Sequence, residues 1–167
     1  MKEIFAKPAV GAIIEKVINN KKYILIQDRN KNNEVIETGM IEIPAGKIRE
    51  YENIFNALRR EVWEETGLNI TEIVGEEEKV ESSDSGYKTI SYLPFCSTQN
   101  LSGGYSLILQ TFICHGEGEL LKQTNESINI QWQSIENVEN MLKRSPEKFY
   151  PMHINALRKY IANNLII

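Results

Sequence analysis

The sequence predicts an α/β fold in which a mixed β-sheet carries helices on its faces. Strand-like segments rich in branched apolar residues occupy the first part of the chain. One amphipathic helical segment follows in the middle, and two more helical segments end the chain. Strands first, a single helix in the middle and helices last favour helices packed against a sheet.

Composition indicates one globular domain spanning residues 1–167. The chain is long enough to bury a core, and its apolar content of 41% and charged content of 25% are typical of globular proteins. The formal net charge of −4 does not indicate a nucleic acid or an anionic membrane as the partner. A polyanionic substrate would therefore need metal ions or local basic residues.

The two cysteines and the chain start point to an ordinary cytoplasmic protein. Cys96 and Cys114 lie in separate apolar stretches without the spacing of a zinc site, so we expect two buried apolar side chains. The first residues show no export or organelle signal. Every apolar run is far shorter than a membrane span of about 20 residues.

Three strands are expected before the central helix, at residues 8–17, 22–27 and 39–44. Asn19 and Asn20 predict a hairpin turn between the first two strands. Residues 29–35 form a polar loop, and Pro44 ends the third strand. The first two strands are therefore expected to pair as a hairpin.

The central helix is expected at residues 53–66, with Gly67 as its stop residue. Further strands are expected at residues 70–80, 88–95, 105–115 and 128–132, with a turn at 82–86. Ser134 caps a predicted helix at 134–143, a short segment starts at 145–146, and a last helix covers 152–163.

The central helix carries glutamates where a surface helix would not. At about 100° per residue, an apolar stripe faces the core. Glu61 and Glu65 fall on or beside this stripe, and Glu64 lies just off its edge. The stripe consists of Ile54, Leu58 and Val62.

Three carboxylates beside a buried face repel one another and lose hydration. Such an arrangement is stable with protonation, with arginine partners or with bound cations. Carboxylate oxygens are the ligands that Mg²⁺ and Mn²⁺ prefer, so the pattern predicts a metal site. The helical wheel alone leaves a plain solvated face as an equal alternative.

Residues 46–68 resemble the Nudix box, G-x5-E-x7-R-E-U-x-E-E-x-G-U, in which U is a bulky aliphatic residue. Residues 42–46, which read EIPAG, also resemble the strand and loop that lead into the box in this family. The resemblance implies a Nudix-type α/β/α sandwich with a mixed β-sheet. Every specified position matches, namely Gly46, Glu52, Arg60, Glu61, Val62, Glu64, Glu65, Gly67 and Leu68.

The resemblance implies a metal site made by Glu61, Glu64 and Glu65, the same three residues that the helical wheel singles out. Gly46 would allow a tight loop that brings backbone carbonyls towards the metals and phosphates. The implied cofactor is Mg²⁺, with Mn²⁺ as a substitute.

The remaining box residues would have structural roles. The guanidinium group of Arg60 would hold carboxylates in position, together with Glu52. Gly67 would end the helix in a conformation that other residues adopt only at a cost.

Members of the family cleave a diphosphate linkage by water attack, which requires a general base. Glu64 or Glu65 could serve, as could a carboxylate in a loop late in the fold. Glu126, just before the strand at 128–132, is the main loop candidate, and Glu117 and Glu119 are its alternatives.

The substrate implied is a nucleoside diphosphate linked to another group. Ala45 in the entrance to the box slightly favours ADP-ribose or a nucleotide sugar over an oxidised or non-canonical nucleoside triphosphate of the MutT type. Arg29 could contact a phosphate. The aromatic residues available for base stacking are Tyr23, Tyr87, Tyr92, Phe95, Tyr105 and Phe112.

Two further alternatives stay open. A Nudix-fold sensor could bind a nucleotide without cleaving it, although such proteins typically lose box glutamates and this chain keeps them all. Homodimers are common in the family, and the sequence does not decide between a monomer and a homodimer.

Overall fold

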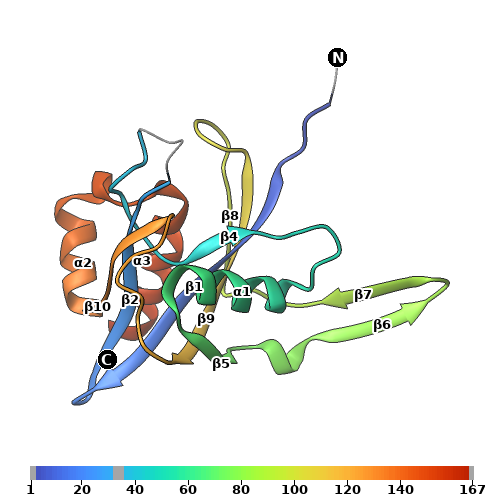
Figure 1. Ribbon diagram of the computed structural model, residues 1–167, viewed down its shortest axis with the longest axis horizontal. Coiled ribbons are helices and arrows are strands. Elements are labelled where there is room, and N and C mark those ends of the chain that lie inside the picture. The colour runs from blue at the N-terminus through green and yellow to red at the C-terminus, as the bar shows by residue number, and fades with distance from the viewer. Residues whose placement is uncertain (1–2, 32–35, 166–167) are drawn as a thin grey trace.

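The structure is a computed structural model that describes residues 3–31 and 36–165 (Figure 1). Part of the polar loop expected at 29–35 therefore lies outside the described residues. The elements in chain order are β1 (Lys7–Ile18), β2 (Lys21–Arg29), β3 (Ile41–Glu42), β4 (Ala45–Lys47), α1 (Ile54–Thr66), β5 (Asn69–Ile73), η1 (Glu76–Glu78), β6 (Val80–Asp84), β7 (Tyr87–Ser91), β8 (Cys96–Gln99), β9 (Leu107–Glu117), β10 (Ser127–Ser134), α2 (Ile135–Arg144), η2 (Pro146–Lys148) and α3 (Pro151–Leu165).

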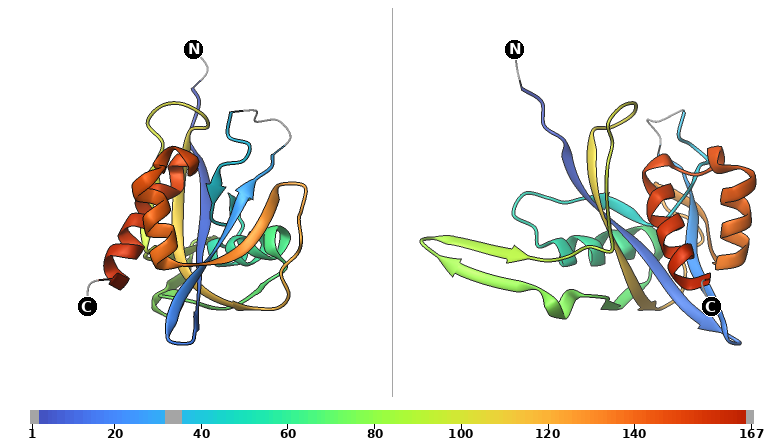
Figure 2. Two further views of the ribbon diagram at one scale, coloured as in Figure 1. Left: turned by 90° about the vertical axis from the view of Figure 1, so that its left-hand side faces the viewer. Right: turned by 180° about the vertical axis from the view of Figure 1, so that it is seen from behind.

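A mixed sheet forms the middle layer. Its main path runs β10-β2-β1-β9-β5, and β3, β4 and β8 pair with β2, β1 and β9 respectively. The ladder between β1 and β9 is parallel, whereas the other ladders of the sheet are antiparallel. Helix α1 lies on one face, and α2 and α3 lie on the other (Figure 2). This arrangement confirms the predicted α/β/α sandwich.

The sheet separates two hydrophobic cores, and alternate residues of β1 reach into each. Ala12 and Ile14 pack with α1, whereas Ile13 packs with α2 and α3. A strand covered on both faces needs an apolar side chain at nearly every position, which explains the unbroken apolar run in β1. On α1, the predicted stripe is buried and is joined by Phe55 and Ala57.

Several local predictions are confirmed. Asn19 and Asn20 form the turn between β1 and β2 with positive φ angles of 49° and 61°. The Ser134 side chain accepts a hydrogen bond from the Asn137 N–H and caps the start of α2. Gly67 ends α1 with φ 81°.

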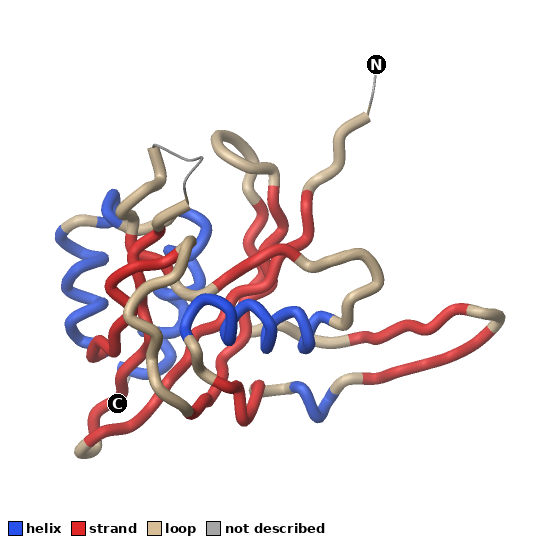
Figure 3. The backbone as a smooth tube through the Cα atoms, in the orientation of Figure 1, coloured by secondary structure: helices blue, strands red, loops and turns tan. Residues whose placement is uncertain are grey.

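Other local predictions are wrong. The single strand expected at 70–80 is interrupted, because β5 ends at Ile73 and Gly75, with φ 86°, begins the 3-10 turn Glu76–Glu78. The turn expected at 82–86 is shorter, because β6 continues to Asp84. The hairpin of β6 and β7 projects away from the main sheet (Figure 3). β4 and β8 were not predicted, since such short strands show no clear alternation.

The apolar segments of the chain pack inside the sandwich. Cys114 is buried, as expected, whereas Cys96 is only partly buried, and both are free thiols. Among the helices in the part of the chain that the structure describes, none is long and apolar enough to cross a membrane.

A buried histidine joins α3 to the segment between β3 and β4. The Ile43 N–H donates to His153 Nδ1 over 3.1 Å, so this nitrogen carries no proton. The ring packs edge-on against Tyr150, with centroids 5.1 Å apart. Burial, aided by the charges of Arg29 and Lys31, lowers the pKa of His153 to about 3.

This depressed pKa predicts a loss of stability in mild acid. Below pH 6.5, the approximate pKa of histidine in the unfolded chain, His153 is protonated in the unfolded state. In the folded state it stays neutral until the pH approaches 3. The contribution to the free energy of unfolding is therefore complete above pH 6.5 and falls by about 2 kcal/mol between pH 7 and pH 5.

Urea unfolding at pH 7, 6 and 5 measures this effect. The control is His153→Asn, which places a neutral acceptor near the position of Nδ1. We expect its stability to fall less over this range than that of the wild type. Parallel pH profiles for the two proteins would show that His153 titrates normally in the folded state.

Candidate active site

The carboxylates of α1 differ sharply in burial. Only 3% of Glu65 is exposed, because it points from α1 across the sheet towards β2. Glu61 is mostly covered, with 13% of its side chain exposed, whereas 44% of the Glu64 side chain is exposed. This order matches the helical wheel, which placed Glu61 and Glu65 on the apolar stripe and Glu64 at its edge.

One oxygen of Glu65 is held by the protein and the other is not. Oε2 accepts hydrogen bonds from Gln27 Nε2 at 2.9 Å and from the Ala45 N–H at 3.1 Å. Oε1 is buried and has no hydrogen-bond partner among residues 3–31 and 36–165. Burial, with the nearby charge of Glu42, raises the pKa of Glu65 to about 8. An unpaired buried acceptor is unfavourable unless a cation or proton satisfies it.

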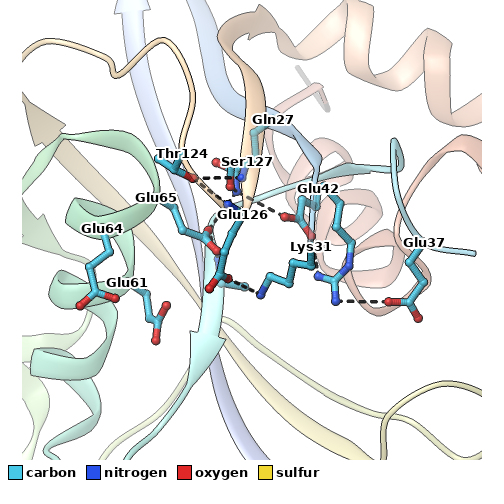
Figure 4. A network of polar contacts seen from close by, with 12 residues as sticks. Gln27, Lys31, Glu37, Glu42, Glu61, Glu64, Glu65, Thr124, Glu126 and Ser127 are labelled. Atoms are coloured by element: carbon cyan, nitrogen blue, oxygen red, sulfur yellow. Dashed lines mark hydrogen bonds and ion pairs between the residues drawn. The ribbon is translucent and has the colours of Figure 1, made fainter. Parts of the chain in front are cut away.

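Gln27 connects three strands behind this carboxylate. Its side-chain nitrogen also lies 2.8 Å from Ser127 Oγ on β10 and 3.4 Å from Glu42 Oε1 on β3. Gln27 and Ser127 are completely buried. Figure 4 shows these side chains converging beside Glu65, so a polar network fixes its position from the side opposite α1.

Arg29 continues the network towards the surface. Its guanidinium pairs with Glu42 at 3.0 Å and with Glu37 at 3.2 Å, and lies 4.4 Å from the centre of the Tyr150 ring. Burial raises the pKa of Glu42, and the Arg29 charge opposes this. Arg29 is thus a buried, fixed residue in a cavity wall, and not the solvated loop arginine that is the simplest alternative.

Arg60 holds the outer carboxylates of the box. Nε and Nη2 donate to the two oxygens of Glu52 at 2.7 and 2.8 Å, which is a bidentate pair. These hydrogen bonds lower the pKa of Glu52 to about 2. Nη1 contacts Glu61 and lies 3.4 Å from Glu64 Oε2. The geometry agrees with the structural roles expected for Glu52 and Arg60.

Gly46 is needed for a reason other than the one expected. It lies in β4 and is not among the glycines with positive φ. A Cβ atom at this position would lie 2.0 Å from the Glu61 carboxyl carbon. A glycine here lets Glu61 lie directly against the backbone of β4, so any side chain would displace that carboxylate.

The structure brings Glu126 to the box carboxylates. A recess of about 200 Å³ is lined by Glu61, Glu64, Glu65 and Glu126, with Thr124 and Asn125. Lys31 pairs with Glu126 at 2.8 Å. The alternative candidates do not line the recess: Glu117 pairs with Asn69 at the end of β9, and the Glu119 carbonyl lies near Gly67.

This recess opens into a larger cavity of about 360 Å³, and the two share Glu61, Glu64 and Glu126. The walls of the larger cavity carry opposite charges. Carboxylates of α1 lie on one side, and basic groups from the sheet and loops lie on the other. The basic side chains from the sheet and loops are Arg29, Lys31, Lys47 and Arg49, whereas Arg60 also lines the cavity but comes from α1 itself. Such a cavity can bind cations and a phosphate chain side by side.

The donor set fits a hard divalent cation. Within residues 3–31 and 36–165, no three His, Cys, Asp or Glu side chains are grouped to hold a metal as they stand. Arg60 draws Glu61 and Glu64 to one side, and Gln27 holds Glu65 on the other. All three line one recess, however, and the buried Glu65 Oε1, which has no hydrogen-bond partner among the described residues, is an oxygen that a hard cation could bind.

Several residues of the site were not predicted. Gln27, Lys31, Glu42 and Ser127 come from β2, β3, β10 and the segment after β2, and only the pairing of these strands brings them together. The only indication for Gln27 in the sequence is that it is a polar residue at the end of the apolar run of β2. The others looked like ordinary loop or strand-end polar residues.

Comparison with solved structures gives similar folds at low sequence identity. The NUDIX domain of Shewanella oneidensis NrtR, complexed with ADP ribose, matches with a TM-score of 0.68 and 12% identity, covering 97% of this chain and 90% of that one. A C. elegans Ap4A hydrolase in a binary complex matches with a TM-score of 0.56 and 16% identity, covering 95% and 97%. The MutT protein from Methanosarcina mazei Go1 matches with a TM-score of 0.58 and 19% identity, covering 95% of each chain.

Comparison with curated protein sequences gives no significant match. The model of the NUDIX domain family matches residues 7–153, which include β1, the whole box and the start of α3. The match extends over most of the chain, and it agrees with the sandwich fold and with the box. The chain therefore belongs to the NUDIX domain family.

Proposed function

We propose that this protein is a Mg²⁺-dependent hydrolase, with Mn²⁺ as a substitute, that cleaves the diphosphate linkage of a nucleoside diphosphate joined to another group. One observation carries the proposal: the recess lined by the box carboxylates, with the unpaired Glu65 Oε1, adjoins a cavity lined by basic side chains. A diphosphate bridged by divalent cations is the ligand that satisfies both walls.

Glu61, Glu64 and Glu65 would hold the metal. Bound Mg²⁺ would neutralise phosphate oxygens and lower the pKa of the attacking water. Gln27 and the Ala45 N–H orient Glu65 through Oε2, which leaves Oε1 directed at the cation. The neighbouring Gly46 carbonyl is proposed as a further ligand, because β4 lies directly against Glu61.

Glu126 is the proposed general base that accepts the proton of the attacking water. It lines the same recess as the metal ligands, and Lys31 holds its carboxylate there. Glu64 and Glu65 are less suited, because Arg60 contacts the first and the network around Gln27 holds the second.

The basic wall would bind the phosphates. Lys47 and Arg49 are exposed at the cavity, where they can reach a ligand without breaking buried contacts. Arg29 is proposed as a substrate-binding residue whose guanidinium is fixed in advance by Glu42 and Glu37. Preorganised charges lose little entropy when they bind an anion.

ADP-ribose or a nucleotide sugar is the preferred substrate class. The sequence of the box entrance favours it, and a structure with this fold binds ADP ribose. The NUDIX domain of NrtR, the Ap4A hydrolase and the MutT protein all have this fold. The fold alone therefore does not determine the substrate.

A substrate panel tests the proposal. ADP-ribose, a nucleotide sugar, a dinucleoside polyphosphate and an oxidised nucleoside triphosphate are each incubated with Mg²⁺, Mn²⁺ or EDTA, and released phosphates are measured. We expect metal-dependent cleavage that is fastest for the first two. Faster cleavage of the triphosphate would support a MutT-type enzyme. Binding of a nucleotide with no cleavage of any compound would support a sensor.

Glu64→Gln tests the metal site with little risk to the fold, because Glu64 is the most exposed box carboxylate. We expect the turnover number to fall by more than about 100-fold, since even outer-shell changes at metal sites cost 10- to 100-fold. The matched control is Glu50→Gln, an exposed glutamate of the box loop, which should keep wild-type turnover. Near-normal activity of Glu64→Gln would exclude this residue as a metal ligand.

Gln27→Met tests the network that positions Glu65. The change keeps the side-chain volume but removes the donor to Glu65 Oε2. We expect turnover to fall about 10- to 100-fold and the Mg²⁺ concentration for half-maximal rate to rise. Gln131→Met, at an exposed strand position, serves as the control. An unchanged Mg²⁺ requirement would show that Gln27 has only a packing role.

A further inference from the structure

The main cavity has a second neighbour at the end away from the metal ligands. This hollow, of about 240 Å³, shares Tyr105, Tyr150 and Met152 with the main cavity. It shares no lining residue with the recess of Glu61, Glu65 and Glu126. The recess and the hollow therefore each adjoin the main cavity but not each other, so the basic residues of the main cavity lie between the carboxylates of the recess and this hollow.

The hollow has the composition of a site for a flat, mostly apolar group. Its walls include two tyrosines and two methionines, with the carboxylate of Glu37 as a polar edge. Methionine adapts to irregular shapes, and aromatic rings favour contact with another ring. Its volume lies below the roughly 300 Å³ of a complete small-molecule site, so it suits one part of a larger ligand. The methionines are Met40 and Met152.

The loop at residues 100–105, which lines the hollow, is held in place by its own hydrogen bonds. Asn100 Nδ2 donates to the Gly103 carbonyl and, over 2.6 Å, to the Tyr105 carbonyl, and Asn100 Oδ1 accepts from the Ser102 N–H. Gly103 and Gly104 have φ angles of 76° and 58°, which favour glycine. A preorganised wall lowers the entropic cost of binding.

Positive charge gathers where the hollow meets the main cavity. Lys47 Nζ lies 5.2 Å and Lys7 Nζ 5.8 Å from the centre of the Tyr105 ring. On the other side, the Arg29 guanidinium covers the Tyr150 ring. An apolar group in the hollow would thus be joined to an anionic group in the main cavity.

We propose that this hollow binds the nucleobase of the substrate, so that the nucleoside occupies the end of the groove at Tyr105 and the group to be released lies towards Glu64 and Glu126. The assignment rests on the diphosphate site proposed above and adds the direction in which the substrate lies. It selects Tyr105 from the aromatic residues that the sequence offered for base stacking. The other five do not line the cavity or the hollow.

Calorimetric titration in Mg²⁺ tests the proposal without requiring cleavage. The probes are α,β-methylene-ADP, which carries a base, and methylenediphosphonate, which has neither base nor sugar. Ser102→Trp fills the hollow from an exposed loop position, and Ser91→Trp places the same side chain on the projecting hairpin as a control. We expect Ser102→Trp to weaken binding of α,β-methylene-ADP at least tenfold while methylenediphosphonate binding stays within twofold.

Tyr105→Ala is a second variant that introduces no bulk. Loss of a stacking partner should weaken α,β-methylene-ADP binding at least about fivefold and spare methylenediphosphonate. The proposal is overturned if both variants bind α,β-methylene-ADP with the affinity of the wild type. It is also overturned if the variants lose affinity for both probes equally, or if the wild type binds the two probes with the same affinity. Failure of the proposed function has a different signature, which is the absence of cleavage across the substrate panel while α,β-methylene-ADP still binds.

Discussion

The site is built around the burial of a carboxylate, Glu65, at the junction of helix and sheet. Because α1 packs its apolar stripe against the sheet, Glu65 is brought into the interior with it. One of its oxygens is then satisfied by Gln27 and Ala45, and the other has no hydrogen-bond partner among the described residues. The raised pKa of Glu65 has the same origin as its suitability for a cation: a desolvated charge lacks a partner.

Two close contacts set where α1 lies relative to this network. Gly46 lets the Glu61 carboxylate rest on the backbone of β4, and Arg60 ties the helix to Glu52 in the preceding loop. The box thus combines ligands with the residues that position them. Its glycine, outer glutamate and arginine determine the placement of the three glutamates on α1.

Charge separation across the cavity explains how an acidic protein can take an anionic substrate. The net charge is −4, yet the sheet and the loops beside it supply four basic side chains to the cavity, Arg29, Lys31, Lys47 and Arg49. Several of these groups are already paired with glutamates, for example Arg29 with Glu42 and Lys31 with Glu126. The local field at the cavity, and not the overall charge, decides what binds there.

The sequence by itself determined the sandwich, the position of α1 and the three glutamates, because periodicity, capping residues and the box are local in the chain. It also named Glu126 and Arg29, which the fold brings to the cavity. Only the tertiary structure placed Gln27, Glu42 and Ser127 behind Glu65, and it showed that the Glu61 carboxylate lies directly against Gly46. These relations depend on strand register and helix packing between distant segments, which no local pattern encodes. The choice of Tyr105 from six aromatic residues has the same cause, since its loop meets Tyr150 and Met152 only in the folded chain.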